Sequence, residues 1–234
     1  TPPMAMKLPR ATIEELDGLV EQLTKPDAPL REEATKRLLE YERNGRLPLE
    51  ALLEFSESEN PPLSMYAISA LGRNGQPAAL KKLIDLAQRH RAGNPLFLAQ
   101  IVDALGDTHH AGASPMLLGL LGLRTGRGKL FGRKSRKEEE EAALERSRAF
   151  LTLPVLRALE KVGDAKAAAL LGDYLEHPEP LVRWHAIQNL VRCNVLQFNE
   201  RLKQMADGDG NALVREAAAI AIERLEPLPP NLNN

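Results

Sequence analysis

The chain has 234 residues, 43% of them hydrophobic, so it is long enough to bury a sizeable core. Its 31 basic and 32 acidic residues nearly cancel, which excludes recognition of nucleic acid or membrane through overall charge. The single cysteine, Cys193, excludes an intramolecular disulfide framework and a multi-cysteine metal site and favours a reducing, cytoplasmic location, and no apolar run is long enough to span a bilayer.

Helices are predicted along almost the whole chain, because Leu, Ala, Glu and Arg are abundant while Val, Ile and Thr are sparse. We expect an N-terminal tail over 1–11, a repeat domain over 12–226 and a C-terminal tail over 227–234. Apolar spacing within the repeat domain predicts pairs of helices. The first helix of each pair is predicted at 13–24, 49–56, 78–90, 114–123, 165–175 and 196–205.

The second helix of each pair, which we name the anchor helix, begins with a recurrent motif. Its clearest copy is Val182-Arg183-Trp184-His185-Ala186, and further copies begin at Leu30, Leu63 and Val214. Degenerate copies begin at Phe97 and Leu151. A helical hairpin of this size buries its apolar stripe only by stacking on neighbours. The residues at the alanine position, spaced 33, 34, 54, 31 and 32 residues apart, therefore predict six stacked hairpins: Ala34, Ala67, Ile101, Val155, Ala186 and Ala218.

The pattern Val-Arg-x-x-Ala, followed by Ala-Leu-Gly, resembles HEAT repeats over residues 12–225, in particular the short bacterial HEAT-like repeats of phycobilisome-lyase-like proteins. The resemblance implies an all-α solenoid with a right-handed superhelix. It also implies that first helices form the convex face and anchor helices a concave face that commonly holds another protein. Arg31, Arg183 and Arg215 are then expected to link neighbouring repeats through hydrogen bonds to carboxylates or carbonyls.

Glycine and proline predict where some anchor helices end or deviate. Gly72, Gly106 and Gly163 follow three anchor helices, where a residue with left-handed backbone conformation is expected. Pro154 lies inside the fourth anchor helix, where it removes a hydrogen bond and clashes with the carbonyl of Phe150. A kink or break is therefore predicted at that turn.

Positions two, three and six of each anchor helix, counted from the first motif residue as zero, are predicted to face the concave groove. The centre of this groove is apolar and aromatic, and it contains Trp184, the only tryptophan of the chain. Such a patch suits partner binding, although packing of Met65, Tyr66 and Trp184 between repeats explains it equally well. The predicted partner-binding residues are Met65, Tyr66, Gln100, Arg157, Trp184, His185 and Gln188.

The fourth repeat carries an insert, predicted as a loop over about 123–137. Glutamates 138–141 follow it, and Ser135 with Glu138 predicts the start of the next helix. Three interpretations stay open: a solvated loop without a partner, a contact for an acidic protein surface and a contact for nucleic acid, which the neighbouring glutamates disfavour. The candidate residues for an anionic partner are Arg124, Arg127, Lys129, Arg133, Lys134, Arg136 and Lys137.

No catalytic, cofactor-binding or metal-binding residue is predicted. Asp107, His109 and His110 lack further ligands at suitable spacing, and His185 and Cys193 do not converge on one straight helix. The sequence thus predicts a non-enzymatic scaffold or adaptor that binds a protein segment in its groove, with the basic loop as a second contact. The alternatives are nucleic-acid binding through that loop and, by family analogy, a lyase or chromophore-handling role.

Overall fold

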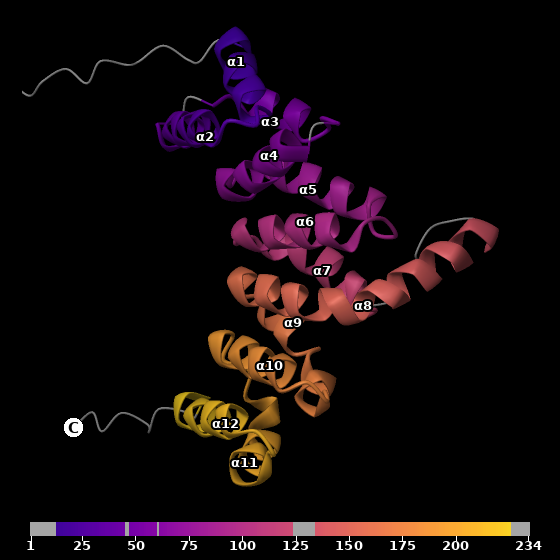
Figure 1. Cartoon of the computed structure of the whole chain (residues 1–234). Coiled ribbons are helices and arrows are strands. Elements are labelled where there is room, and N and C mark those ends of the chain that lie inside the picture. Colours follow the sequence, from indigo (N-terminus) through magenta and orange to yellow (C-terminus); the bar gives the residue numbers. More distant parts are fainter. Residues whose placement is uncertain (1–12, 45–46, 60, 124–133, 226–234) are drawn as a thin grey trace, which may run out of the picture.

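The fold is described from a computed structural model that places residues 13–44, 47–59, 61–123 and 134–225 (Figure 1). This part of the chain consists of α-helices and short 3₁₀ helices joined by turns, and it contains no strand. The predicted all-α solenoid is therefore confirmed. None of the helices in these ranges combines the length and the apolar character that a membrane crossing requires.

The helices follow one another as hairpins, in the order that the motif predicts. The first helices are α1 (Ile13–Leu23), α3 (Leu49–Phe55), α5 (Pro77–Arg89), α7 (Ser114–Leu120), α9 (Ala165–Ala168) and α11 (Asn199–Gly208). Short 3₁₀ helices η1 (Ala111–Ala113), η2 (Gly172–Glu176) and η3 (Leu196–Phe198) lie beside the last three. The anchor helices are α2 (Ala28–Arg43), α4 (Pro61–Asn74), α6 (Pro95–Asp107), α8 (Lys134–Val162), α10 (Pro180–Arg192) and α12 (Ala212–Leu225).

The starts of the anchor helices follow from local chemistry. Asn94 precedes α6 and its side chain accepts a hydrogen bond from the backbone N–H of Leu96 at 2.9 Å, while Asp27 caps α2 in the same way. Proline occupies the first turn of α2, α6 and α10, where its missing N–H is not needed. These signals set the register of each anchor helix and hence which residues it exposes.

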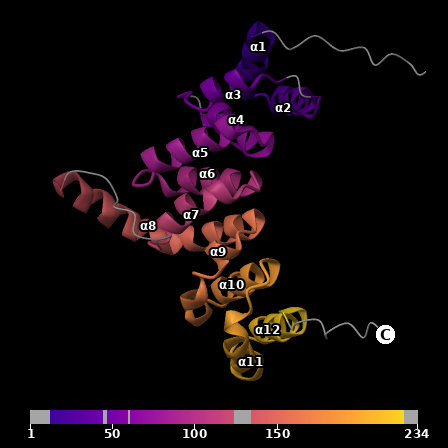
Figure 2. The ribbon, with the colours of Figure 1, turned by 180° about the vertical axis from the view of Figure 1, so that it is seen from behind.

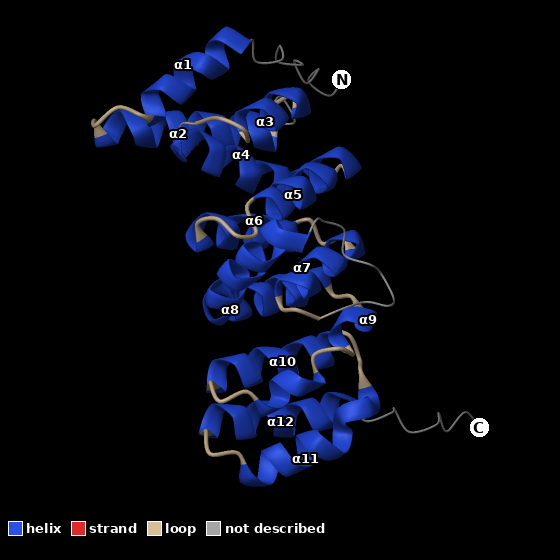
Figure 3. Ribbon diagram, turned by 90° about the vertical axis from the view of Figure 1, so that its right-hand side faces the viewer, coloured by secondary structure: helices blue, strands red, loops and turns tan. Residues whose placement is uncertain are grey.

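The anchor helices from α4 to α12 pack on one another in a row, and the first helices pack alongside them as a second layer (Figures 1 and 3). The result is an elongated stack. The first half of α8 departs from this arrangement, because it extends away from the stack in both opposite views (Figures 1 and 2).

The core of the stack divides at the fifth hairpin. One cluster of buried apolar residues runs from Leu16 to Leu171 and includes Val182, and the second runs from Ala168 to Leu225. Tyr174 is partly buried and packs against both clusters. The two parts of the core therefore meet around η2 and the start of α10.

Two of the three glycines expected to end helices have another role. Gly163 has a φ of +68°, as predicted, but Gly72 and Gly106 lie within α4 and α6. A Cβ atom on Gly72 would lie 2.6 Å from the carbonyl oxygen of Ala104, and one on Gly106 would lie 2.8 Å from the Cα of Ala158. These glycines are required because neighbouring anchor helices approach each other closely there.

Of the predicted kink or break at Pro154, the break is wrong, because α8 continues through it to Val162, and the kink stays a prediction. Losing one helical hydrogen bond at proline costs about 3 kcal/mol. Leu151, Val155, Leu156 and Leu159 are almost fully buried, and burial of each such side chain contributes about 1.5–3 kcal/mol. Packing of the helix on its neighbours therefore outweighs the local cost.

The start of α8 also differs from the prediction. The helix begins at Lys134, so residues 134–137 are helical rather than the end of a loop, and Ser135 is not the residue before the first turn. Of the insert, residues 124–133 lie outside the described part.

Candidate functional site: the exposed face of the anchor helices

The predicted partner-binding residues lie on four successive anchor helices. α4 provides Met65 and Tyr66, α6 provides Gln100 and α8 provides Arg157. The last three residues, Trp184, His185 and Gln188, belong to α10. We name the exposed sides of these helices the anchor face.

Polar contacts join consecutive anchor helices along this face. Gln100 donates from its amide nitrogen to the backbone oxygen of Met65 at 2.9 Å, which ties α6 to α4. Lys161 donates to Asp103 at 2.7 Å and to Asp107 at 2.8 Å, which ties α8 to α6. Burial opposes the charge of Lys161, but the two carboxylates raise its pKa above the ordinary value. These contacts hold the anchor face in one arrangement.

Tyr66 is less available than the sequence suggested. Its hydroxyl donates to Glu42 at 3.4 Å, and Arg73 donates to the same carboxylate at 2.6 and 2.9 Å. Burial, together with the Glu42 charge, raises the pKa of Tyr66. Tyr66 therefore connects α4 to the end of α2, while the neighbouring Met65 side chain is 43% exposed.

Arg157 and Gln188 occupy the middle of the face. Arg157 is exposed and makes no ion pair with any residue that the structure describes, while Gln188 is half-buried. The guanidinium of Arg157 is therefore an exposed cation on the surface of α8, without a carboxylate partner among the described residues, and a partner carboxylate can contact it.

Trp184 and His185 lie where the anchor face contains a pocket. Their rings meet edge to face, with centroids 4.8 Å apart. His185 also contacts Glu160 of α8, with 3.1 Å between its Nδ1 and the carboxylate oxygen Oε2. Trp184 is half-buried and packs against the second core cluster. Both residues line a pocket of about 410 Å³ between the starts of α10 and α12, together with Glu179, Pro180, Leu181, Asn211 and Leu213.

Sequence reasoning did not include the residue immediately before each motif. In the last four repeats this residue is large, apolar and exposed: Leu96 is 67% exposed, Phe150 47%, Leu181 49% and Leu213 62%. Their identical position in successive copies of the motif was the available signal. This repeated position places apolar side chains along one edge of the stack. Two of them, Leu181 and Leu213, line the pocket.

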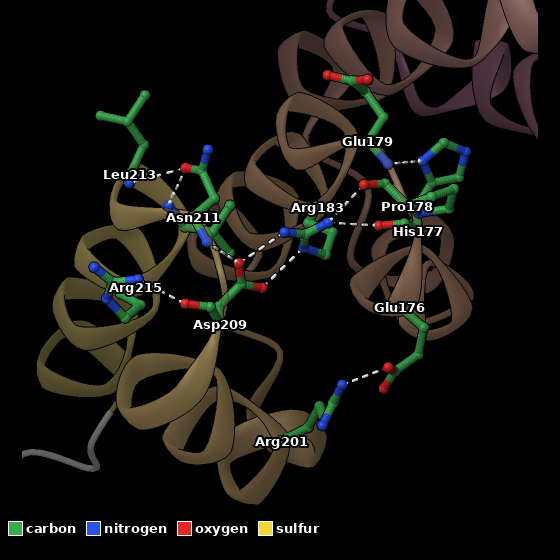
Figure 4. A network of polar contacts seen from close by, with 11 residues as sticks. Glu176, His177, Pro178, Glu179, Arg183, Arg201, Asp209, Asn211, Leu213 and Arg215 are labelled. Atoms are coloured by element: carbon green, nitrogen blue, oxygen red, sulfur yellow. Dashed lines mark hydrogen bonds and ion pairs between the residues drawn. The ribbon is translucent and has the colours of Figure 1, made fainter.

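The arginines that follow the first motif residue make structural contacts, but of the three only Arg183 joins neighbouring repeats as the resemblance implies, since Arg31 and Arg215 bind carbonyls within their own hairpins. Arg183 donates to both carboxylate oxygens of Asp209, at 2.7 and 2.8 Å, and to the backbone oxygens of His177 and Pro178 (Figure 4). The hydrogen bonds from Arg183 lower the pKa of Asp209. Arg215 binds the carbonyl of Asp209 and Arg31 that of Lys25, each at 2.7 Å.

His109 and His110, which follow Asp107 in the sequence, take part in local contacts. His109 lies 2.9 Å through Nδ1 from the carbonyl oxygen of Lys161, and His110 accepts from the backbone N–H of Gly112 at 2.9 Å. Burial raises the pKa of the Cys193 thiol, which disfavours the reactive thiolate. Within the described ranges, no three His, Cys, Asp or Glu side chains are grouped as metal ligands.

Most of the basic insert lies outside the described residues. Arg124, Arg127, Lys129 and Arg133 lie outside the described residues. The backbone of Lys134, Arg136 and Lys137 forms the start of α8, and the positions of their side chains are likewise outside the described part. Another pocket, of about 710 Å³, lies between α2, α3 and α4.

A family model described as HEAT repeats matches residues 16–93 and 151–223, which together exceed half of the chain. The chain belongs to the HEAT-repeat family. The interval between the two matched regions of this HEAT-repeat protein contains α6, η1, α7, the insert and the first half of α8. A search of curated proteins found no match.

Two solved structures are similar to this HEAT-repeat protein. One is the complex of CpcE and CpcF of phycocyanin lyase from Nostoc, with 23% identity, a TM-score of 0.51 and coverage of 91% of this chain and 77% of that chain. This likeness supports the fold alone. The other is human deoxyhypusine hydroxylase in complex with glycerol, with 17% identity, a TM-score of 0.33 and coverage of 91% and 96%. It is too distant to carry an argument.

Proposed function

We propose that this HEAT-repeat protein is a non-enzymatic scaffold that binds a segment of another protein along its anchor face. The observation that carries the proposal is the anchor face itself. Apolar and charged groups, among them Met65 and Arg157, are exposed on consecutive helices that polar contacts fix relative to one another. A surface ordered before binding loses little conformational entropy when a partner docks.

The family and the similar structure support a protein partner. HEAT repeats suggest an interaction scaffold, and the solved structure from Nostoc is of a protein that assembles with a second protein. The basic insert, over 124–137, is proposed as a second contact, because a run of seven cations attracts an acidic surface.

Affinity capture from a lysate of the source cells tests this proposal. The intact chain is compared with Met65→Ser/Arg157→Ala, which removes one exposed apolar group and one exposed cation from the anchor face. The matched control, Leu170→Ser/Lys81→Ala, removes the same kinds of exposed groups from first-helix segments. We expect a captured partner to be lost with the first variant and retained with the control. Equal capture by all three proteins would refute the anchor face as the binding surface.

A further variant tests the insert. Replacing Arg124, Arg127, Lys129 and Arg133 by glutamine is expected to weaken capture at low salt and to have less effect at high salt, because exposed charges are screened. Unchanged capture at low salt would leave the insert without a role in binding.

A further inference from the structure

The pocket between α10 and α12 has a chemistry that selects its occupant. Its walls are mainly apolar, since Pro180, Leu181, Trp184 and Leu213 line it. Leu181 and Leu213 are both about half exposed or more, so the apolar surface is open to solvent. An apolar side chain that enters here gains burial on several sides.

The charge at the pocket is a carboxylate. Glu179 lines it, and neither a lysine nor an arginine does. Glu179 directly precedes α10, but its side chain makes no capping hydrogen bond, and no hydrogen bond or ion pair to this carboxylate exists among the described residues. Figure 4 shows it directed away from the Arg183 network. Arg183 itself is occupied by Asp209 and two carbonyls.

Asn211 adds a hydrogen-bond donor with a fixed orientation. Its Oδ1 accepts from the backbone N–H of Leu213 at 3.0 Å and of Val214 at 3.4 Å, which caps α12 (Figure 4). The cap assigns the other amide atom as nitrogen. The Nδ2 group has no partner in the described part of the chain and is available to a backbone carbonyl.

We infer that this pocket receives a large aliphatic or aromatic side chain from an extended peptide segment that has a lysine or arginine beside it. The inference rests on the proposed scaffold function and identifies the chemistry of the partner. The apolar side chain fills the space between Leu181, Trp184 and Leu213, and the neighbouring cation pairs with Glu179. A peptide carbonyl accepts the hydrogen bond from Asn211. A segment with Asp or Glu in place of the cation is rejected, because like charges meet at Glu179.

Selection of a phage-displayed library of short random peptides against the full chain tests this inference. Synthetic copies of the enriched peptides are then titrated by fluorescence anisotropy. The enriched sequences are expected to share a large apolar residue next to Lys or Arg. Leu213→Ser is expected to weaken binding by about tenfold or more, and Leu170→Ser, an exposed leucine outside the pocket, to leave it unchanged.

A separate pair of variants tests whether the bound peptide needs a cation to pair with Glu179. Glu179→Gln is expected to weaken binding by about threefold at low salt and to reduce the salt dependence of binding, because a solvent-exposed ion pair contributes little and is screened by salt. Glu223→Gln removes an exposed carboxylate from the far end of α12 and serves as the control. Enrichment of acidic neighbours, or equal binding to Leu213→Ser and the intact chain, would overturn the inference.

The outcomes separate the inference from the scaffold proposal. Peptides that lose affinity for Met65→Ser/Arg157→Ala but keep it for Leu213→Ser would show that the anchor face binds segments and that the pocket does not select them. Failure to enrich any peptide, or enrichment of peptides that bind all these variants equally, would contradict both.

Discussion

The close approach of α6 and α8 gives a quantitative prediction for Gly106→Ala. The added Cβ would lie 2.8 Å from the Cα and 3.0 Å from the Cβ of Ala158, whereas carbon atoms in contact prefer about 3.5–4.0 Å. The nearest atom is backbone, so the two helices must separate. Overpacking of this kind costs about 1–3 kcal/mol, and replacing a helical glycine by alanine returns about 0.5–1 kcal/mol. We expect a net destabilisation of about 0.5–2 kcal/mol.

Gly119→Ala is the matched control, because Gly119 lies in α7 of the adjoining hairpin and an added Cβ there meets nothing within 4 Å. This variant is expected to be more stable than the original chain by about 0.5 kcal/mol. Urea unfolding, followed by the helical circular dichroism signal, measures both changes. If Gly106→Ala unfolds at the same or a higher urea concentration than the original chain, α6 and α8 separate without cost and the packing argument is refuted.

Two further predictions concern charged pairs. Arg183→Met removes the guanidinium that donates to the carboxylate of Asp209, whose side chain is only 8% exposed, and we expect a loss of about 1.5–3 kcal/mol in urea unfolding. Equal stability of Arg183→Met would contradict the structural role of the pair. Arg89 and Lys82 lower the pKa of Glu57 from 4.5 to about 2. The stability that these two ion pairs give to the fold is therefore fully present above pH 4.5 and is lost as the pH falls towards 2. Because Glu57 is 42% exposed, we expect less than about 1 kcal/mol, measured as a smaller acid-induced loss of stability in Glu57→Gln.

The helical pairs could be predicted because the signals that define them are local. Motif spacing, apolar periodicity and proline at helix starts predicted where five of the anchor helices begin to within two residues, whereas α8 begins 17 residues before its motif residue Leu151. The first helices of the last two hairpins were less regular than expected: 165–175 divides into α9 and η2, and 196–205 into η3 and α11. Short helices of this kind depend on tertiary packing more than on propensity.

The errors at Gly72, Gly106 and Pro154 have a common physical origin. A glycine near the end of an anchor helix suits either a left-handed backbone or a close contact, and only the distance to Ala104 or Ala158 decides which. Similarly, the cost of proline is local, while the burial that compensates it involves α6 and α10, which are distant in sequence. Both outcomes depend on contacts with helices that are distant in sequence, so the local sequence does not predict them.

The candidate site was predicted in part. Helical periodicity identified half-exposed side chains on one side of α4, α6, α8 and α10, but it did not show that Tyr66 and Gln100 bridge helices. The assignment of these residues to partner binding stays a prediction. The pocket at Trp184 was missed because its walls come from two repeats. Leu213 follows Leu181 by 32 residues in sequence, and the two lie at one pocket only after the repeats stack.

Buried small residues and polar contacts together determine how rigid the anchor face is. From α4 to α8, glycines allow close helix contacts and Gln100 and Lys161 link the helices from the surface. At the junction of α8 and α10 the two helices are joined by a buried hydrogen bond from the side-chain amide of Asn189 to the carbonyl oxygen of Leu156, at 3.0 Å. The position equivalent to the glycines is Glu160 there, which contacts His185 instead of allowing close approach, and the core divides nearby. Bending of the stack is therefore expected at this junction. Such bending changes the distance between Arg157 and the Trp184 pocket, whereas the distance between Met65 and Arg157 is kept. A bound segment that contacts both sides of the junction would therefore also fix the curvature of the solenoid.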